Sequence, residues 1–80
     1  MIFKIMTMKR YQAETLRLDR FSSWEAWSGV YRDKPLESTI KKFNRNFRTY
    51  KKKYMFAVFK QIPAQRNGRE SFKWEFVRLI

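Results

Sequence analysis

The dipeptide Asn67-Gly68 constrains the fold of this chain more than any other feature of the sequence. It separates two segments rich in apolar residues, and Asn-Gly is the preferred pair for a two-residue turn between antiparallel strands. Such a turn fixes the register, so the numbers of paired residues must sum to 135. Lys60 then lies opposite Glu75, and Phe59 lies opposite Phe76. The ion pair and the aromatic pair each favour this register by roughly 0.2–1 kcal/mol.

The strand before the turn is expected over Tyr54–Ile62, and the strand after it over Ser71–Leu79. The first of these is apolar at successive positions through Phe59, which is typical of a strand covered on both faces. Pro63 has no backbone N–H, so we expect it to weaken the ladder, and a bulge there would shift the register.

The segment that follows Pro35 predicts an amphipathic helix. Proline is well tolerated at the first helical position, and the negative charge of Glu37 suits the dipole in the first turn. Five apolar residues follow at spacings of four and three and form a stripe about 80° wide on a helical wheel. They are Leu36, Ile40, Phe43, Phe47 and Tyr50. The cations on the opposite side, expected to face solvent, are Lys41, Lys42, Arg45, Arg48 and Lys52.

The charge of the chain is concentrated in a window without acidic residues, from Ser38 to Arg69. Ten of the 19 Lys and Arg residues lie in this window, and all seven Asp and Glu residues lie outside it. The window therefore carries +10 of the formal net charge of +12. A helix face that only provides solubility normally mixes both signs, because like charges one turn apart are destabilising. The imbalance indicates a polyanionic partner.

The N-terminal third carries weaker signals for secondary structure. Strands are expected over Phe3–Lys9 and Thr15–Phe21. Ser22 and Glu25 have the spacing of a capping box, which predicts a short helix that Gly29 would end. The aromatic residues spaced for one face of that helix are Trp24, Trp27 and Tyr31.

Together these elements predict a single α+β domain over residues 1–80. A small antiparallel sheet of about four strands is packed by one amphipathic basic helix, in the order strand, strand, short helix, helix, strand, strand. A domain of this size has a thin core, which eight Phe, four Tyr and three Trp help to fill. A homodimer could form through an edge strand of the sheet.

The residues of common catalytic and metal sites are absent or badly placed. There is no cysteine and no histidine, which removes the usual zinc ligands and the usual general base. Glu70 and Glu75 are five residues apart on a strand, which places them about 16 Å apart on opposite faces. We therefore expect no enzyme activity, no cofactor and no metal. The apolar run Tyr54–Phe59 is far too short to cross a membrane, and the N-terminus lacks the pattern of a signal peptide, so a cytoplasmic location is expected.

These observations predict a small basic protein that binds DNA or RNA through the phosphate backbone, with low sequence specificity. Asn44, Arg45 and Arg48 are also spaced for contacts with base edges in a major groove. Arginines beside the Asn-Gly turn could enter a groove, as β-ribbon readers do. The residues expected to contact the polyanion are Lys41, Lys42, Arg45, Arg48, Lys51, Lys52, Lys53, Arg66 and Arg69.

An acidic protein surface is the alternative partner. In this interpretation the chain is a small inhibitor or adaptor that docks on a nucleic-acid-processing enzyme, with Trp24, Trp27 and Tyr31 as aromatic anchors. Exposure of the three rings in one patch would favour docking on a protein, and their burial would favour the electrostatic interpretation. Binding to a membrane surface ranks third, because it requires the apolar stripe to face lipid. In size, basicity and lack of cysteine the chain resembles many small proteins of phages and other mobile elements. It reproduces none of the motifs of RNA-recognition, helix-turn-helix or zinc-finger families.

Overall fold

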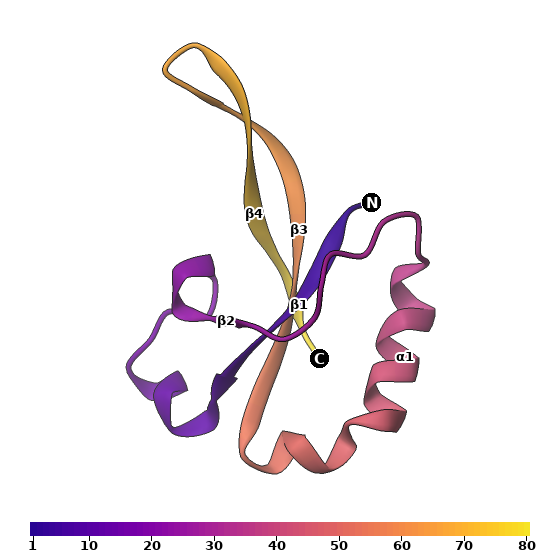
Figure 1. The fold of residues 1–80 in the computed structure, drawn as a ribbon. Helices are drawn as coiled ribbons and strands as arrows, with labels where there is room; N and C mark the ends of the chain where they lie inside the picture. Colours follow the sequence, from indigo (N-terminus) through magenta and orange to yellow (C-terminus); the bar gives the residue numbers. More distant parts are fainter.

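Strands β1 (Phe3–Lys9) and β3 (Tyr54–Arg66) lie side by side at the centre of one sheet (Figure 1). The computed structural model, which describes residues 1–80, gives the strand order β2-β1-β3-β4, and every neighbouring pair is antiparallel. The outer strands are β2 (Glu25–Ala26) and β4 (Arg69–Leu79). With the single α-helix α1 (Leu36–Asn46), these strands confirm the α+β fold predicted from the sequence.

Four consecutive residues of β3, Phe56–Phe59, are buried. Because neighbouring residues of a strand point to opposite faces, both faces of the sheet must be covered here, as the apolar run predicts. On one face Ile40 of α1 packs with Val58, and Phe43 packs with Phe56 at 4.8 Å between ring centroids. The apolar stripe of the helix therefore faces the sheet.

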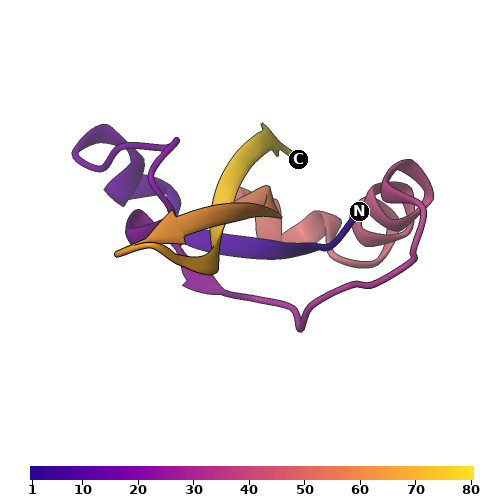
Figure 2. The same ribbon diagram turned by 90° about the horizontal axis from the view of Figure 1, so that it is seen from above.

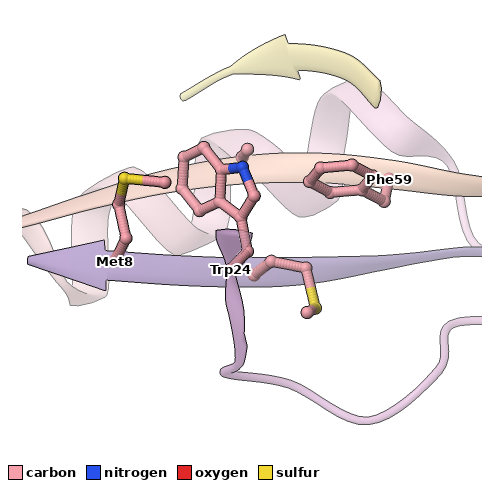
Figure 3. Packing of buried hydrophobic residues seen from close by; sticks show 5 residues of the cluster. Met8, Trp24 and Phe59 are labelled. Atoms are coloured by element: carbon pink, nitrogen blue, oxygen red, sulfur yellow. The ribbon is translucent and has the colours of Figure 1, made fainter. Parts of the chain in front are cut away.

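On the other face of the sheet, Trp24 lies between Met8 and Phe59 in one buried cluster (Figure 3). The ring centroids of Trp24 and Phe59 lie 6.1 Å apart, and the Nε1–H of Trp24 donates a hydrogen bond of 2.8 Å to the carbonyl of Leu18. The turns that close this side are the 3-10 turns η1 (Arg10–Glu14) and η2 (Phe21–Ser23). Figures 1 and 2 show these turns and α1 on opposite sides of the central strands.

The hairpin between β3 and β4 has the predicted turn and, over most of its length, the predicted register. Asn67 and Gly68 both have positive φ angles, 53° and 74°, as a type I′ turn requires. The predicted pairs Phe59 with Phe76 and Lys60 with Glu75 are both present. The Lys60 Nζ lies 3.5 Å from the Glu75 carboxylate, so the expected ion pair forms.

The register shifts at a bulge between Val58 and Phe59, and there the prediction is wrong. Val58 pairs with Arg78, not with Val77. The bulge inserts one residue into β4, and it changes which residues of β4 contact the core and the helix. Val77 joins the cluster that contains Val58, while Arg78 reaches α1 and pairs with Glu37 at 3.0 Å. One strand thereby supplies both an apolar contact and an ion pair to the helix.

Pro63 causes neither the bulge nor the end of the strand, and β3 continues to Arg66. The backbone N–H of Gln61 donates to the carbonyl of Ile2 at 2.8 Å, on the β1 side. N–H groups alternate in direction along a strand, so the nitrogen of Pro63 also points to that side. β1 begins only at Phe3, which pairs with Lys60, so the missing N–H removes no bond from the ladder. The hairpin therefore projects beyond β1 (Figure 1).

The N-terminal third differs from the prediction in two places. The segment Thr15–Phe21 forms no strand, because its backbone turns back on itself and the N–H of Leu16 donates to the carbonyl of Gln12. The second strand lies instead at Glu25–Ala26, inside the segment expected to be a short helix.

The aromatic residues of this segment explain why it is extended. Trp24 packs with Phe59 on one face of the sheet, and Trp27 packs with Phe56 on the other, at 5.0 Å between centroids. Residues three apart point to opposite faces of an extended chain but to one face of a helix. The N–H groups of Trp27 and Ser28 both donate to the carbonyl of Ile5, which holds the segment against β1.

The helix begins directly after Pro35 as predicted, but it ends at Asn46, not at Tyr50. A tighter 3-10 turn, η3 (Arg48–Lys52), follows it. Asn and Thr are weak helix formers, and the turn keeps the rings of Phe47 and Tyr50 within 5.5 and 5.6 Å of Trp27. No helix of this protein has the length and apolar character needed to cross a membrane.

Candidate nucleic-acid interface

The outward face of α1 carries three exposed cations, Lys41, Lys42 and Arg45. Ile40 and Phe43 anchor the opposite face of the helix to the sheet, so the orientation of the cationic face is set by the core. A helix rises about 1.5 Å per residue. The cations are therefore held at fixed spacings on a rigid element, as the periodicity of the sequence predicts.

The remaining cations expected on the helix face lie beyond the end of the helix. Arg48 and Lys52 belong to η3, and Lys53 follows that turn. All three are exposed, whereas Lys51 is half-buried. The prediction that Arg48 and Lys52 share the helical face is wrong, because α1 ends before them. The cations continue from the helix around the turn to the start of β3.

Arg10 joins this surface from a distant part of the sequence. Its backbone N–H donates to the carbonyl of Lys53 at 2.9 Å, and its Nε–H donates to the carbonyl of Lys51 at 2.5 Å. Lys9 precedes it and pairs with Tyr54 across β1 and β3. Neither residue is predicted from the sequence, because only the pairing of β1 with β3 brings them beside the lysines. The set hereafter called the cationic surface is Lys9, Arg10, Lys41, Lys42, Arg45, Arg48, Lys51, Lys52 and Lys53.

None of these nine side chains forms an ion pair. The ion pairs of the protein join Arg17 with Asp19, Lys60 with Glu75 and Arg78 with Glu37. Glu37 is the only acid on α1, and it points to Arg78 of β4. The folded structure therefore leaves the charge of the cationic surface uncompensated.

Lys51 is the one half-buried cation of this surface. Burial lowers its pKa below the ordinary value of 10.5, and the neighbouring Arg10 lowers it further. Its Nζ donates a hydrogen bond to Oδ1 of Asn44. Asn44 is half-buried and occupied by this bond, which argues against its use in reading base edges. A phosphate bound nearby would favour the charged form of Lys51 and act against the lowering of its pKa.

The two arginines at the hairpin tip are not part of the cationic surface. Arg66 and Arg69 form the pair that closes the turn, and both are exposed. Figure 1 shows the tip of the hairpin projecting away from both α1 and η3. The structure thus separates these two arginines from the lysines and arginines of α1 and η3, with which the sequence predicts a shared binding site.

The three expected aromatic anchors do not form one exposed patch. Trp24 is buried against Phe59, and Tyr31 is half-buried with its ring stacked on Phe3 at 5.1 Å. Trp27 keeps 36% of its surface exposed, but its ring lies among four other aromatic rings. The anchors thus divide between the two faces of the sheet.

Comparisons with protein-family models, with curated proteins and with solved structures found no match for this chain.

Proposed function

We propose that this protein binds nucleic acid through the phosphate backbone, with the cationic surface as its binding site. The observation that supports the proposal is the absence of any ion pair among these nine cations in a folded structure. A polyanion supplies the compensating charge and releases its own counterions on binding. The charges come from α1, η3 and the end of β1, which are fixed to one another by the core and by the bonds of Arg10.

The proposed binding has low sequence specificity and involves no catalysis. Lys and Arg side chains contact phosphates without reading the bases. The Oδ1 of Asn44, which the sequence spaces for contacts with base edges, is engaged by Lys51. A cytoplasmic location, where the protein meets DNA or RNA, belongs to the same proposal.

The affinity of the protein for nucleic acid should fall steeply with salt. Each phosphate neutralised contributes about −0.9 to the slope of log K against log salt on duplex DNA, and about −0.7 on a single strand. Engagement of about four to six phosphates predicts a slope of roughly −3 to −5. Fluorescence anisotropy with a labelled oligonucleotide, titrated at several salt concentrations, measures this slope. A slope near zero would contradict a phosphate-based interface.

An acidic protein surface remains the alternative partner, and a pull-down from cell extract with and without nuclease separates the two. Partners that disappear after nuclease treatment support the proposal. A single protein that resists nuclease supports the alternative. The separation of Trp24 from Trp27 and Tyr31 leaves the alternative without the exposed aromatic patch that its anchors would need.

Formation of a homodimer also belongs to this proposal, through the outer edge of β4. β4 is the last strand of the sheet, so no strand pairs with that edge. An antiparallel pairing of two copies centred on Trp74 would place Lys73 opposite Glu75 and Phe72 opposite Phe76. Opposite charges and aromatic pairs are the combinations that favour a cross-strand register.

A further inference from the structure

Two adjacent hollows lie where β1 ends and β3 begins, and they share Lys53 and Tyr54. The first has a volume of about 350 Å³ and is completed by Lys9, Arg10 and Tyr11. The second has a volume of about 360 Å³ and is completed by Thr49, Tyr50 and Lys52. Each hollow therefore has two tyrosine rings and at least two cations in its wall, and neither is lined by an acidic residue.

The tyrosine rings of these hollows are accessible to a ligand. Tyr11 is 71% exposed and Tyr50 is 47% exposed, while Tyr54, which the hollows share, is half-buried. Aromatic side chains of this size are usually buried in the core of a protein or in an interface with a partner. Tyr50 retains its exposure although its ring packs edge-to-face with Trp27, with 5.6 Å between the centroids.

The backbone holds the walls of the two hollows in place. Lys9 pairs with Tyr54 in the sheet, and the N–H of Arg10 donates to the carbonyl of Lys53 at 2.9 Å. The N–H of Lys53 donates in turn to the carbonyl of Tyr50 at 3.2 Å. The order of rings and charges across this end of the sheet is therefore fixed before any ligand binds.

We infer that this end of the sheet binds single-stranded nucleic acid, with unpaired bases stacked on Tyr11 and Tyr50 on either side of Tyr54. The inference rests on the proposed function and names the form of nucleic acid that the site takes. Exposed rings beside a positively charged groove are the common device for binding single strands, because every base has a face that can stack. In a duplex these faces are covered by neighbouring base pairs, so a duplex could use only the cations. Apart from the tyrosine hydroxyls, the one neutral polar side chain that lines either hollow is that of Thr49, which leaves few groups to read the base edges.

The decisive variants remove the rings and leave every cation in place. Stacking of one base on an aromatic ring accounts for about a 5- to 150-fold change in affinity. Tyr11→Ala and Tyr50→Ala should therefore each weaken binding of single-stranded oligothymidylate by at least about fivefold. The matched controls Tyr11→Phe and Tyr50→Phe keep the ring and should stay within about twofold of the wild type, because stacking does not need the hydroxyl. Binding of a DNA duplex should not change in any of the four variants.

A second measurement requires no variant. Ring-proton NMR signals of Tyr11 and Tyr50 should shift when unlabelled wild-type protein is titrated with oligothymidylate. The ring current of a stacked base changes the chemical shifts of the tyrosine ring protons beneath it. Weak single-strand binding by both alanine variants, together with these shifts, supports the inference. Alanine variants that bind oligothymidylate like the wild type, or wild-type protein that binds only duplex, would overturn it. If either of these two results is found together with a steep dependence of affinity on salt, the proposed function still stands. If the protein binds neither oligothymidylate nor duplex, both the inference and the proposed function are contradicted.

Discussion

The double variant Arg45→Glu/Arg48→Glu is expected to lose nucleic-acid binding by about 100-fold or more. Each reversal replaces an attraction to phosphate with a repulsion, and a unit charge 4 Å from another contributes about 1 kcal/mol even in bulk water. The slope of log K against log salt on duplex DNA should also become shallower by about 1.8, because two phosphate contacts are lost. Anisotropy titrations with a labelled oligonucleotide measure both quantities. Unchanged affinity in this variant would refute the proposed site.

The matched control is Arg66→Glu/Arg69→Glu at the hairpin tip. It also changes the formal net charge from +12 to +8, but at a position that projects away from α1 and η3. The affinity of the control for nucleic acid should fall by less than about tenfold, because only the long-range attraction set by the net charge of the protein is weakened. Equal losses in the two double variants would show that total charge governs binding, and not the cationic surface.

The Arg45→Glu/Arg48→Glu variant should fold like the wild type, which makes its binding result interpretable. Both side chains are exposed and form no ion pair. Lys41 and Arg45 lie one helical turn apart, so the reversal at position 45 turns a repulsion into an attraction of a few tenths of a kcal/mol. Circular dichroism and thermal unfolding provide the check.

The largest loss of stability is expected from Phe59→Ala, at about 3–5 kcal/mol. Phe59 is 0% exposed, and its ring lies within 5.3–6.1 Å of Phe21, Trp24 and Phe76. Typical domains have about 0.05–0.15 kcal/mol of stability per residue, which gives roughly 4–12 kcal/mol for a chain of this length. The variant should therefore be unfolded or only marginally folded. Urea unfolding followed by circular dichroism measures the change.

Phe72→Ala is the matched control for this substitution. Phe72 lies on β4, on the same face as Phe76, but it is 67% exposed. Its truncation should change the free energy of unfolding by less than about 0.5 kcal/mol. A loss below about 1 kcal/mol in Phe59→Ala, or similar losses in both variants, would contradict the placement of Phe59 at the centre of the core.

The parts of the fold that the sequence predicted correctly are those encoded by neighbouring residues. The turn at Asn67-Gly68 depends on two residues that tolerate positive φ angles. The start of α1 depends on Pro35, and its buried face depends on a spacing of four and three. The burial of Phe56–Phe59 follows from an apolar run. Each of these signals lies within a few residues of the structure that it specifies.

The parts that the sequence did not predict depend on contacts between distant residues. Trp24 and Trp27 have the spacing of a helix, but partners on opposite faces of the sheet make the segment extended. The bulge in β4 accompanies an ion pair between Arg78 and Glu37 of α1, which is distant in the sequence. Arg10 enters the cationic surface only because β1 pairs with β3. Local patterns carry no information about such pairings.

Mapping of the bound surface on the wild-type protein tests directly whether nucleic acid binds at the cationic surface. Amide signals in a ¹H–¹⁵N NMR spectrum would be followed during titration with a short oligonucleotide at low salt. Signals should shift along α1, η3 and the junction of β1 with β3, at residues of the cationic surface and their neighbours. Signals from the hairpin tip at Arg66 and Arg69 should stay nearly constant. Shifts confined to the hairpin tip, or spread evenly over the molecule, would contradict binding at the cationic surface.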